Sequence, residues 1–261
     1  WVTRYAMARY GMLLHEPAWG ESARESIAEA WQLLSDGIYN CPRGNNQQGP
    51  SESIFCSRPS LRSYQASSWS KMVPYYTAHS TLQAATLLAS VAETIQEARE
   101  RGDITEAAWN NYEYDLVDVC RQALADQARV VYHQAMTDFM NFDREAFARH
   151  SKTFLNLLLC QDSLLATRSE FCVGRWTEQA KRLAHNEEEA RLYEWNARVQ
   201  ITTWGNRYCA DTGKLRDYAH KEWNGLLKDF YFPRWKHFFE ILDKELMGEL
   251  PMSPIGNSST K

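Results

Sequence analysis

The recurrence of apolar residues at helical spacing is the feature that most constrains what this chain can fold into. Ile27, Ala30, Trp31 and Leu34 follow one another at i, i+3, i+4 and i+7, which places them on one face of a helix. The same period returns through most of the chain, and no stretch alternates apolar and polar residues as a half-buried strand does. No repeat of fixed length is present, which argues against a solenoid. We therefore expect an all-α fold, an irregular bundle of about seven to nine helices.

Several polar residues mark where these helices should begin. Ser22 with Glu25, and Asn186 with Glu189, have the spacing of a capping box, in which the first side chain accepts from a backbone N–H of the first turn. Asp143 is a candidate N-cap for a very apolar helix. These positions predict three helix starts.

Other boundaries follow from glycine, proline and breaks in the period. The run from Ile104 to Met140 is periodic, with Asn110 as a candidate break. Gly205 should end the helix that Asn186 opens. A further helix is expected over residues 215–231, and Pro233 should interrupt it and open the last helix.

One long polar loop is expected near residues 40–70, because this stretch is rich in Asn, Gly, Pro and Ser. Cys41 and Cys56 both fall in it. A disulfide between them would suit an exported protein, and it would require Cα atoms within about 7 Å. Two thiols are an equal alternative. The other four cysteines are expected to behave as small buried hydrophobic residues.

Composition sets the size and excludes some partners. The 261 residues are 44% hydrophobic, which suits a single helical domain over residues 1–261 with an ample core. The net charge is −4 with both signs interspersed, so we expect no nucleic-acid partner. No apolar run approaches the ~18 residues of a membrane span.

Motifs that would identify an active site are missing from the sequence. His15 and Glu16 are followed by Trp19 where a zinc-binding H-E-x-x-H motif needs histidine, and no phosphate-binding glycine loop occurs. The seven histidines lack metal-ligand spacing, and no pair among the 33 carboxylates stands out as acid and nucleophile. We therefore expect no metal, no cofactor and no catalytic residue in this chain.

Six segments, in order along the chain, resemble glycoside hydrolase family 89. They are WVTRYAMARYG at 1–11, RPSL at 58–61, YDLVDVCRQ at 114–122, RWTEQA at 175–180, EWNARVQITTWG at 194–205 and LRDYAHKEWNGLLKDFYFPRW at 215–235. They span nearly the whole chain, and the last two are long and specific. The resemblance identifies the chain as the C-terminal helical domain of such an enzyme.

The resemblance implies an exo-acting enzyme that removes terminal α-linked N-acetylglucosamine with retention. Its two catalytic glutamates would lie in a barrel upstream of Trp1, so the isolated chain should be inactive. The implied partners are a glycan ending in that sugar and the barrel of the same polypeptide. Relatives continue with further helices, so the C-terminal end is expected to be truncated. An exported, periplasmic or lysosome-like location is expected.

The resemblance also implies that the helical domain closes one side of the barrel's active-site mouth. The helix ending in Trp204 is the candidate surface, because Asn196, Gln200 and Thr203 form a polar stripe at i, i+4 and i+7. An amide could bind sugar hydroxyls, and the indole could stack on a sugar. The alternatives are a solvated or helix–helix polar face and a tryptophan that caps the helix in the core.

Three more residues are candidates near that helix end. Asp217 and Tyr218 follow the next loop and could face the same cleft, although an aspartate favourable to a helix dipole explains Asp217 equally well. Arg58 could pair with a carboxylate across the domain interface, or be an ordinary surface arginine. Two other functions remain open for the whole chain: a non-catalytic glycan- or protein-binding module, and a purely structural support domain.

Overall fold

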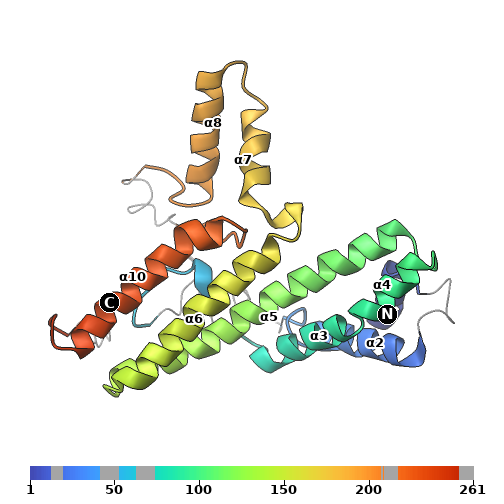
Figure 1. The fold of residues 1–261 in the computed structure, drawn as a ribbon, viewed down its shortest axis with the longest axis horizontal. Helices are drawn as coiled ribbons and strands as arrows, with labels where there is room; N and C mark the ends of the chain where they lie inside the picture. The colour runs from blue at the N-terminus through green and yellow to red at the C-terminus, as the bar shows by residue number, and fades with distance from the viewer. Residues whose placement is uncertain (13–19, 42–52, 63–73, 207, 209–216, 253–261) are drawn as a thin grey trace. The chain divides into compact units, whose positions relative to one another are not determined.

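A computed structural model of the chain describes residues 1–12, 20–41, 53–62, 74–206, 208 and 217–252 (Figure 1). Within these ranges the secondary structure is helical, and the one β-type pairing is an isolated parallel bridge between Cys172 and Asn224. The all-α prediction is confirmed for this part of the chain.

The chain divides into two compact units. One comprises Trp1–Asn46 and Val73–Gln127, and the other comprises Gln47–Met72 and Ala128–Lys261. The long helix α5, Glu106–Met140, passes from the first to the second without a break, so Asn110 does not interrupt it as the sequence suggested. A single domain over 1–261 stays a prediction.

The first unit packs four helices against the first part of α5: α1 (Val2–Arg9), α2 (Gly20–Asp36), α3 (Ala78–Ser90) and α4 (Ala92–Glu100). The predicted face of α2 is confirmed, since Ile27, Ala30 and Leu34 are buried. Helix α2 begins at Gly20, so Ser22 lies in its first turn and is not the N-cap.

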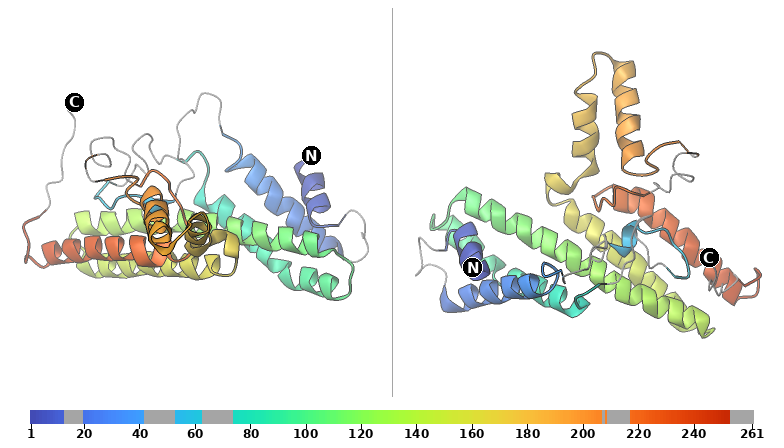
Figure 2. Two further views of the ribbon diagram at one scale, coloured as in Figure 1. Left: turned by 90° about the horizontal axis from the view of Figure 1, so that it is seen from above. Right: turned by 180° about the vertical axis from the view of Figure 1, so that it is seen from behind.

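The second unit contains the rest of α5 together with α6 (Arg144–Leu165), α7 (Val173–Lys181), α8 (Glu187–Gln200) and α10 (Phe232–Leu246). Short 3-10 turns cover Ile54–Cys56 and Ser169–Phe171. Figure 2 shows α7 and α8 as an antiparallel hairpin. Aromatic rings fill the core: Phe154 lies 4.6 Å from Trp235 and 5.4 Å from Phe239, centroid to centroid.

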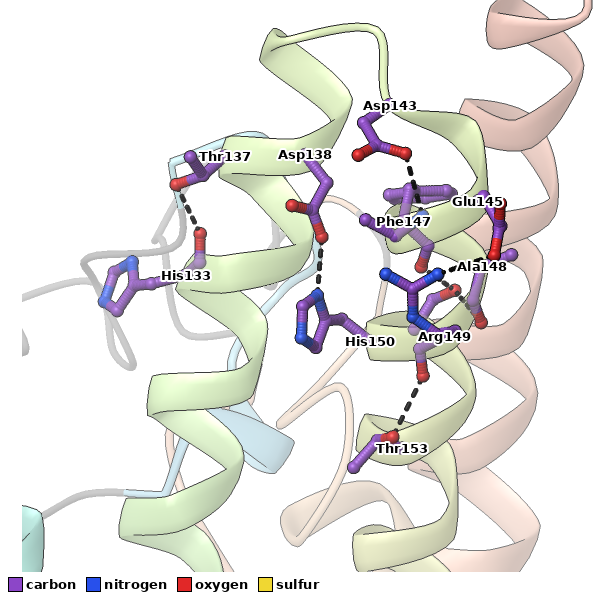
Figure 3. Close-up of polar contacts among 12 residues, drawn as sticks. His133, Thr137, Asp138, Asp143, Glu145, Phe147, Ala148, Arg149, His150 and Thr153 are labelled. Atoms are coloured by element: carbon purple, nitrogen blue, oxygen red, sulfur yellow. Dashed lines mark hydrogen bonds and ion pairs between the residues drawn. The ribbon is translucent and has the colours of Figure 1, made fainter.

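The turn between α5 and α6 confirms one predicted helix start. Asp143 accepts a 3.0 Å hydrogen bond from the backbone N–H of Ala146, as an N-cap should. In the same region, His150 Nδ1 on α6 lies 2.5 Å from Asp138 Oδ2 on α5, so a polar pair also joins the two helices (Figure 3). Asn186 is confirmed in the same way at α8, where it accepts from Glu189 N–H at 2.9 Å.

The expected surface loop near 40–70 is wrong for its described central part. Residues 42–52 and 63–73 lie outside the described ranges, but Ser53 to Ser57 are all buried. The 3-10 turn places Phe55 against Phe154, and Trp235 Nε1 donates to the carbonyl of Phe55 at 2.9 Å. The polar residues on both sides of this segment led to the loop prediction, but the short apolar stretch between them packs in the core.

The helix expected over 215–231 is also wrong. Residues 217–225 are not helical, and a helix starts at Leu226, first as a π-helix over Leu227–Tyr231 and then as α10. Pro233 does not break this helix, and it lies at the start of α10, directly after the π-helical turn Leu227–Tyr231.

Asp162 on α6 fixes the beginning of that helix. Its Oδ1 accepts from the backbone N–H groups of Gly225 at 2.8 Å and Lys228 at 3.1 Å, and its Oδ2 accepts from Asn224 Nδ2 at 2.8 Å. A carboxylate from another helix therefore satisfies donors that the first turn leaves without a partner.

Replacing Asp162 with alanine should destabilise the protein by about 2–4 kcal/mol, because three hydrogen bonds to a nearly buried carboxylate are lost. Denaturant unfolding measures the change. Asp143→Ala is the matched control and should cost about 1 kcal/mol, as an ordinary N-cap does. Equal losses in the two variants would contradict the role given to Asp162.

Candidate functional site

Strained backbone gathers at one place in the second unit. Four non-glycine residues of the described chain have positive φ. Trp204 (66°) lies in the turn after α8, and Asp217 (61°) and His220 (45°) lie in a segment that is hydrogen-bonded to that turn. The fourth, Phe142, lies in the α5–α6 turn. Each left-handed non-glycine residue costs on the order of 1–3 kcal/mol and persists only where its surroundings fix it. Such outliers favour a functional role for this region.

Trp204 is the left-handed residue at the end of α8, where the sequence predicted that Gly205 would end the helix. Helix α8 stops at Gln200, and Trp204 N–H donates to the Val199 carbonyl at 2.7 Å. The indole is 41% exposed and meets Tyr218 edge to face, with centroids 5.1 Å apart. Trp204 is therefore not a core residue, and the structure brings it together with Tyr218 as predicted.

Asp217 is buried, with 1% of its surface exposed, so it does not face a cleft as predicted. Both carboxylate oxygens accept from Arg234 Nη1 at 2.9 Å. Its backbone N–H donates to the Thr202 carbonyl at 2.9 Å, which joins the segment that carries Tyr218 to the turn that carries Trp204. Asp217 thus links Arg234 to the two segments that carry Trp204 and Tyr218.

Arg234 connects this pair to the Ser53–Ser57 segment. Its Nη2 donates to the carbonyls of Cys56 at 3.1 Å and Ser57 at 3.0 Å, and the guanidinium lies 4.9 Å from the ring centre of Tyr231. Arg58 adds a second cation, with its Nε 3.5 Å from Asp217 Oδ2. Within this chain Arg58 therefore pairs with a carboxylate, Asp217, while its pairing across a domain interface stays a prediction.

His220 follows in the same strained segment, and burial lowers its pKa to about 4. Nearby Arg234 and Lys221 also lower it, while Asp217 opposes them. The ring is therefore neutral near neutral pH. Sequence reasoning missed His220, because a lone histidine in a polar stretch carries no pattern.

The two cysteines of the hypothetical disulfide are not joined. Cys41 is an exposed thiol in the first unit, whereas Cys56 is a buried thiol in the second. Burial raises the pKa of Cys56 well above its usual value, so the thiol stays protonated. The alternative of two thiols is therefore the one the structure shows. Cys56 lies in the apolar core, whereas Cys41 is exposed.

Asn196 and Gln200 are exposed on α8. They line a groove between α7 and α8, together with Trp176 and Tyr193, and Trp204 is not among its lining residues. Two of the three residues of the predicted polar stripe therefore line this groove.

Two other classes of feature are absent from the described residues. These ranges contain no cluster of three or more His, Cys, Asp or Glu side chains that could hold a metal ion. Of the helices within them, none is long and apolar enough to cross a membrane.

The described part of the chain is thus an all-α domain with a rigid aromatic surface and a buried ion pair behind it. A family model, "Alpha-N-acetylglucosaminidase (NAGLU) C-terminal domain", matches residues 1–255. The chain belongs to this family, and the resemblance to glycoside hydrolase family 89 is confirmed.

Relatives agree with this assignment. Human α-N-acetylglucosaminidase is 31% identical over 252 residues, which cover 96% of this chain and 29% of that protein. A family 89 glycoside hydrolase from Clostridium perfringens in complex with PUGNAc superposes with a TM-score of 0.77 at 32% identity, covering 89% of this chain and 25% of that one. The Clostridium perfringens enzyme with its substrate GlcNAc-α-1,4-galactose gives 0.77 at 31% identity, covering 88% and 24%. The chain spans less than a third of each relative.

Protein stability should fall as pH drops from about 6.5 to about 4, because the unfolded chain then binds a proton that buried His220 does not. His220→Asn tolerates the left-handed backbone and removes this titration, so its stability should be flatter in this window, by up to about 3 kcal/mol. Urea unfolding at several pH values measures the slope. The exposed His237→Asn is the control, and an unchanged slope in His220→Asn would refute the assignment.

Proposed function

We propose that this chain is the helical domain of an exo-acting glycosidase that removes terminal α-linked N-acetylglucosamine, and that it forms part of the substrate cleft wall. Membership of the family supports the activity, as do the names of the human and Clostridium perfringens relatives. The observation that carries the cleft role is the half-exposed Trp204, held in a strained conformation against Tyr218.

A fixed indole suits sugar recognition. The C–H face of a pyranose packs on an aromatic ring, and a ring that is already immobile loses little entropy on binding. The backbone N–H of Trp204 donates to the Val199 carbonyl, and the Trp204 ring meets the Tyr218 ring edge to face. Arg234 donates to the Asp217 carboxylate, and the Asp217 backbone N–H donates to the Thr202 carbonyl. These buried contacts support the strained backbone at Trp204.

The chemistry itself is proposed to lie outside this chain. A retaining glycosidase needs two carboxyl groups about 5 Å apart, one of them a nucleophile. The carboxylate nearest the aromatic pair, Asp217, is buried and bound by Arg234, so it cannot reach a substrate. We propose that the acid and the nucleophile lie in a barrel of the same polypeptide. Export, or a periplasmic or lysosome-like location, is likewise a proposal and rests on the family alone.

The isolated 261-residue chain should not hydrolyse an aryl α-N-acetylglucosaminide, because the proposed carboxyl pair lies outside it. Release of the aryl group measures turnover, with a buffer blank as the reference. Hydrolysis above the blank that copurifies with the folded chain would contradict the proposal that the catalytic carboxyl groups lie outside this chain.

In the complete enzyme, Trp204→Ala should lower kcat/KM tenfold or more, equivalent to about 1.4 kcal/mol of transition-state stabilisation, while the melting temperature barely changes. The reason is that a half-exposed indole contributes little to the core. Steady-state kinetics and thermal unfolding on one variant measure both quantities.

Trp195→Ala is the matched control, since Trp195 is on α8, the helix that precedes Trp204, and is 62% exposed. It should leave both quantities nearly unchanged. A loss of about 3–5 kcal/mol of stability in Trp204→Ala with normal turnover would instead make the region a purely structural support.

A further inference from the structure

The α7–α8 hairpin carries a groove that the cleft role of Trp204 does not use. Its volume is about 420 Å³, within the roughly 300–1,000 Å³ typical of small-molecule sites. The hairpin of α7 and α8 is seen in Figure 1, and each arm contributes lining residues at i, i+3, i+4 and i+7. The lining residues are Trp176, Gln179 and Ala180 from α7, Leu183 just after it, and Tyr193, Asn196, Ala197 and Gln200 from α8.

The polar groups of this groove are available to a ligand. The side chains of Gln179, Asn196 and Gln200 are exposed, and neither they nor the Tyr193 hydroxyl form a hydrogen bond within the described residues. Each amide offers both donors and an acceptor. A ligand whose groups both donate and accept, as hydroxyl and acetamido groups do, would match all three.

The aromatic walls are fixed in place. Trp176 Nε1 donates to the Ala197 carbonyl at 2.9 Å, which anchors the indole across the two helices and leaves it 36% exposed. Tyr193 lies on the same face of α8 as Ala197, so the Tyr193 ring and the Trp176 indole both line the groove.

No charged side chain lines the groove in the described part of the hairpin. The charged residues of the hairpin pair among themselves, with Arg198 on Glu194 and Lys181 on Glu178. An anionic or cationic ligand would therefore find no partner of opposite charge, and an uncharged one is favoured.

We propose that this groove is a glycan-binding site for an uncharged oligosaccharide, separate from the Trp204–Tyr218 surface. The two rings would pack on the C–H faces of sugar units, and the three amides would bind hydroxyl or acetamido groups at the edges. The choice of a glycan over another uncharged ligand rests on the proposed function of the domain. The site would hold a substrate chain without taking part in the chemistry.

NMR titration of the chain with GlcNAc-α-1,4-galactose tests the proposal. The side-chain amides of Gln179, Asn196 and Gln200 and the indole N–H of Trp176 should shift together. The double variant Gln179→Ala/Asn196→Ala should weaken binding about tenfold, because two hydrogen bonds are lost. Both residues are exposed, so the fold should survive, and the amide spectrum checks this.

Three further variants separate binding in the groove from binding elsewhere on the domain. Tyr193→Ala should weaken binding, whereas Trp195→Ala, on another face of α8, should not. Trp204→Ala should leave groove binding intact, so failure of the cleft proposal and failure of the groove proposal give different results. Shifts that persist in the double variant, no shifts at all, or shifts caused equally by an uncharged Gly-Ser peptide would each overturn the glycan assignment.

Discussion

The buried ion pair between Asp217 and Arg234 is the interaction on which the functional region of the second unit depends. A carboxylate with 1% exposure is tolerated only when its charge is paired and its oxygens are hydrogen-bonded. Arg234 provides both, and it also donates to the carbonyls of Cys56 and Ser57. One guanidinium therefore joins α10, the Ser53–Ser57 segment and the turn after α8. Loss of either partner would leave an uncompensated charge in the core.

The strain at Trp204 is a consequence of this arrangement. A bulky residue with φ of 66° is unfavourable in isolation, so neighbouring contacts must maintain it. The bond from Asp217 to Thr202 does so from one side and the Tyr218 ring from the other. The outcome is an exposed indole whose position is set by buried polar contacts, as expected of a side chain that takes part in recognition.

Helix α8 borders two proposed surfaces. One lies at its C-terminal end and the other along one of its faces. Its C-terminal end leads into the strained turn, while the face that carries Tyr193, Asn196 and Gln200 is turned toward α7. The polar stripe and the aromatic end thus belong to different sites, although they lie on one short segment of sequence. The chain spans about a quarter of the related structures, and both surfaces are proposed contacts for a substrate.

The sequence by itself determined the helical class, the family and the local starts at Asp143 and Asn186, since all of these follow from short-range spacing. It also proposed Trp204 and Tyr218 as cleft residues, which stays a prediction, and the structure shows that their rings meet edge to face. Only the tertiary structure decided that Asp217 is buried and that Ser53–Ser57 fills the core. The physical reason is distance along the chain: the partner of Asp217 lies 17 residues away and that of Cys56 lies 178 residues away. Helical periodicity reports neighbours within two turns and carries no information about which distant charges meet.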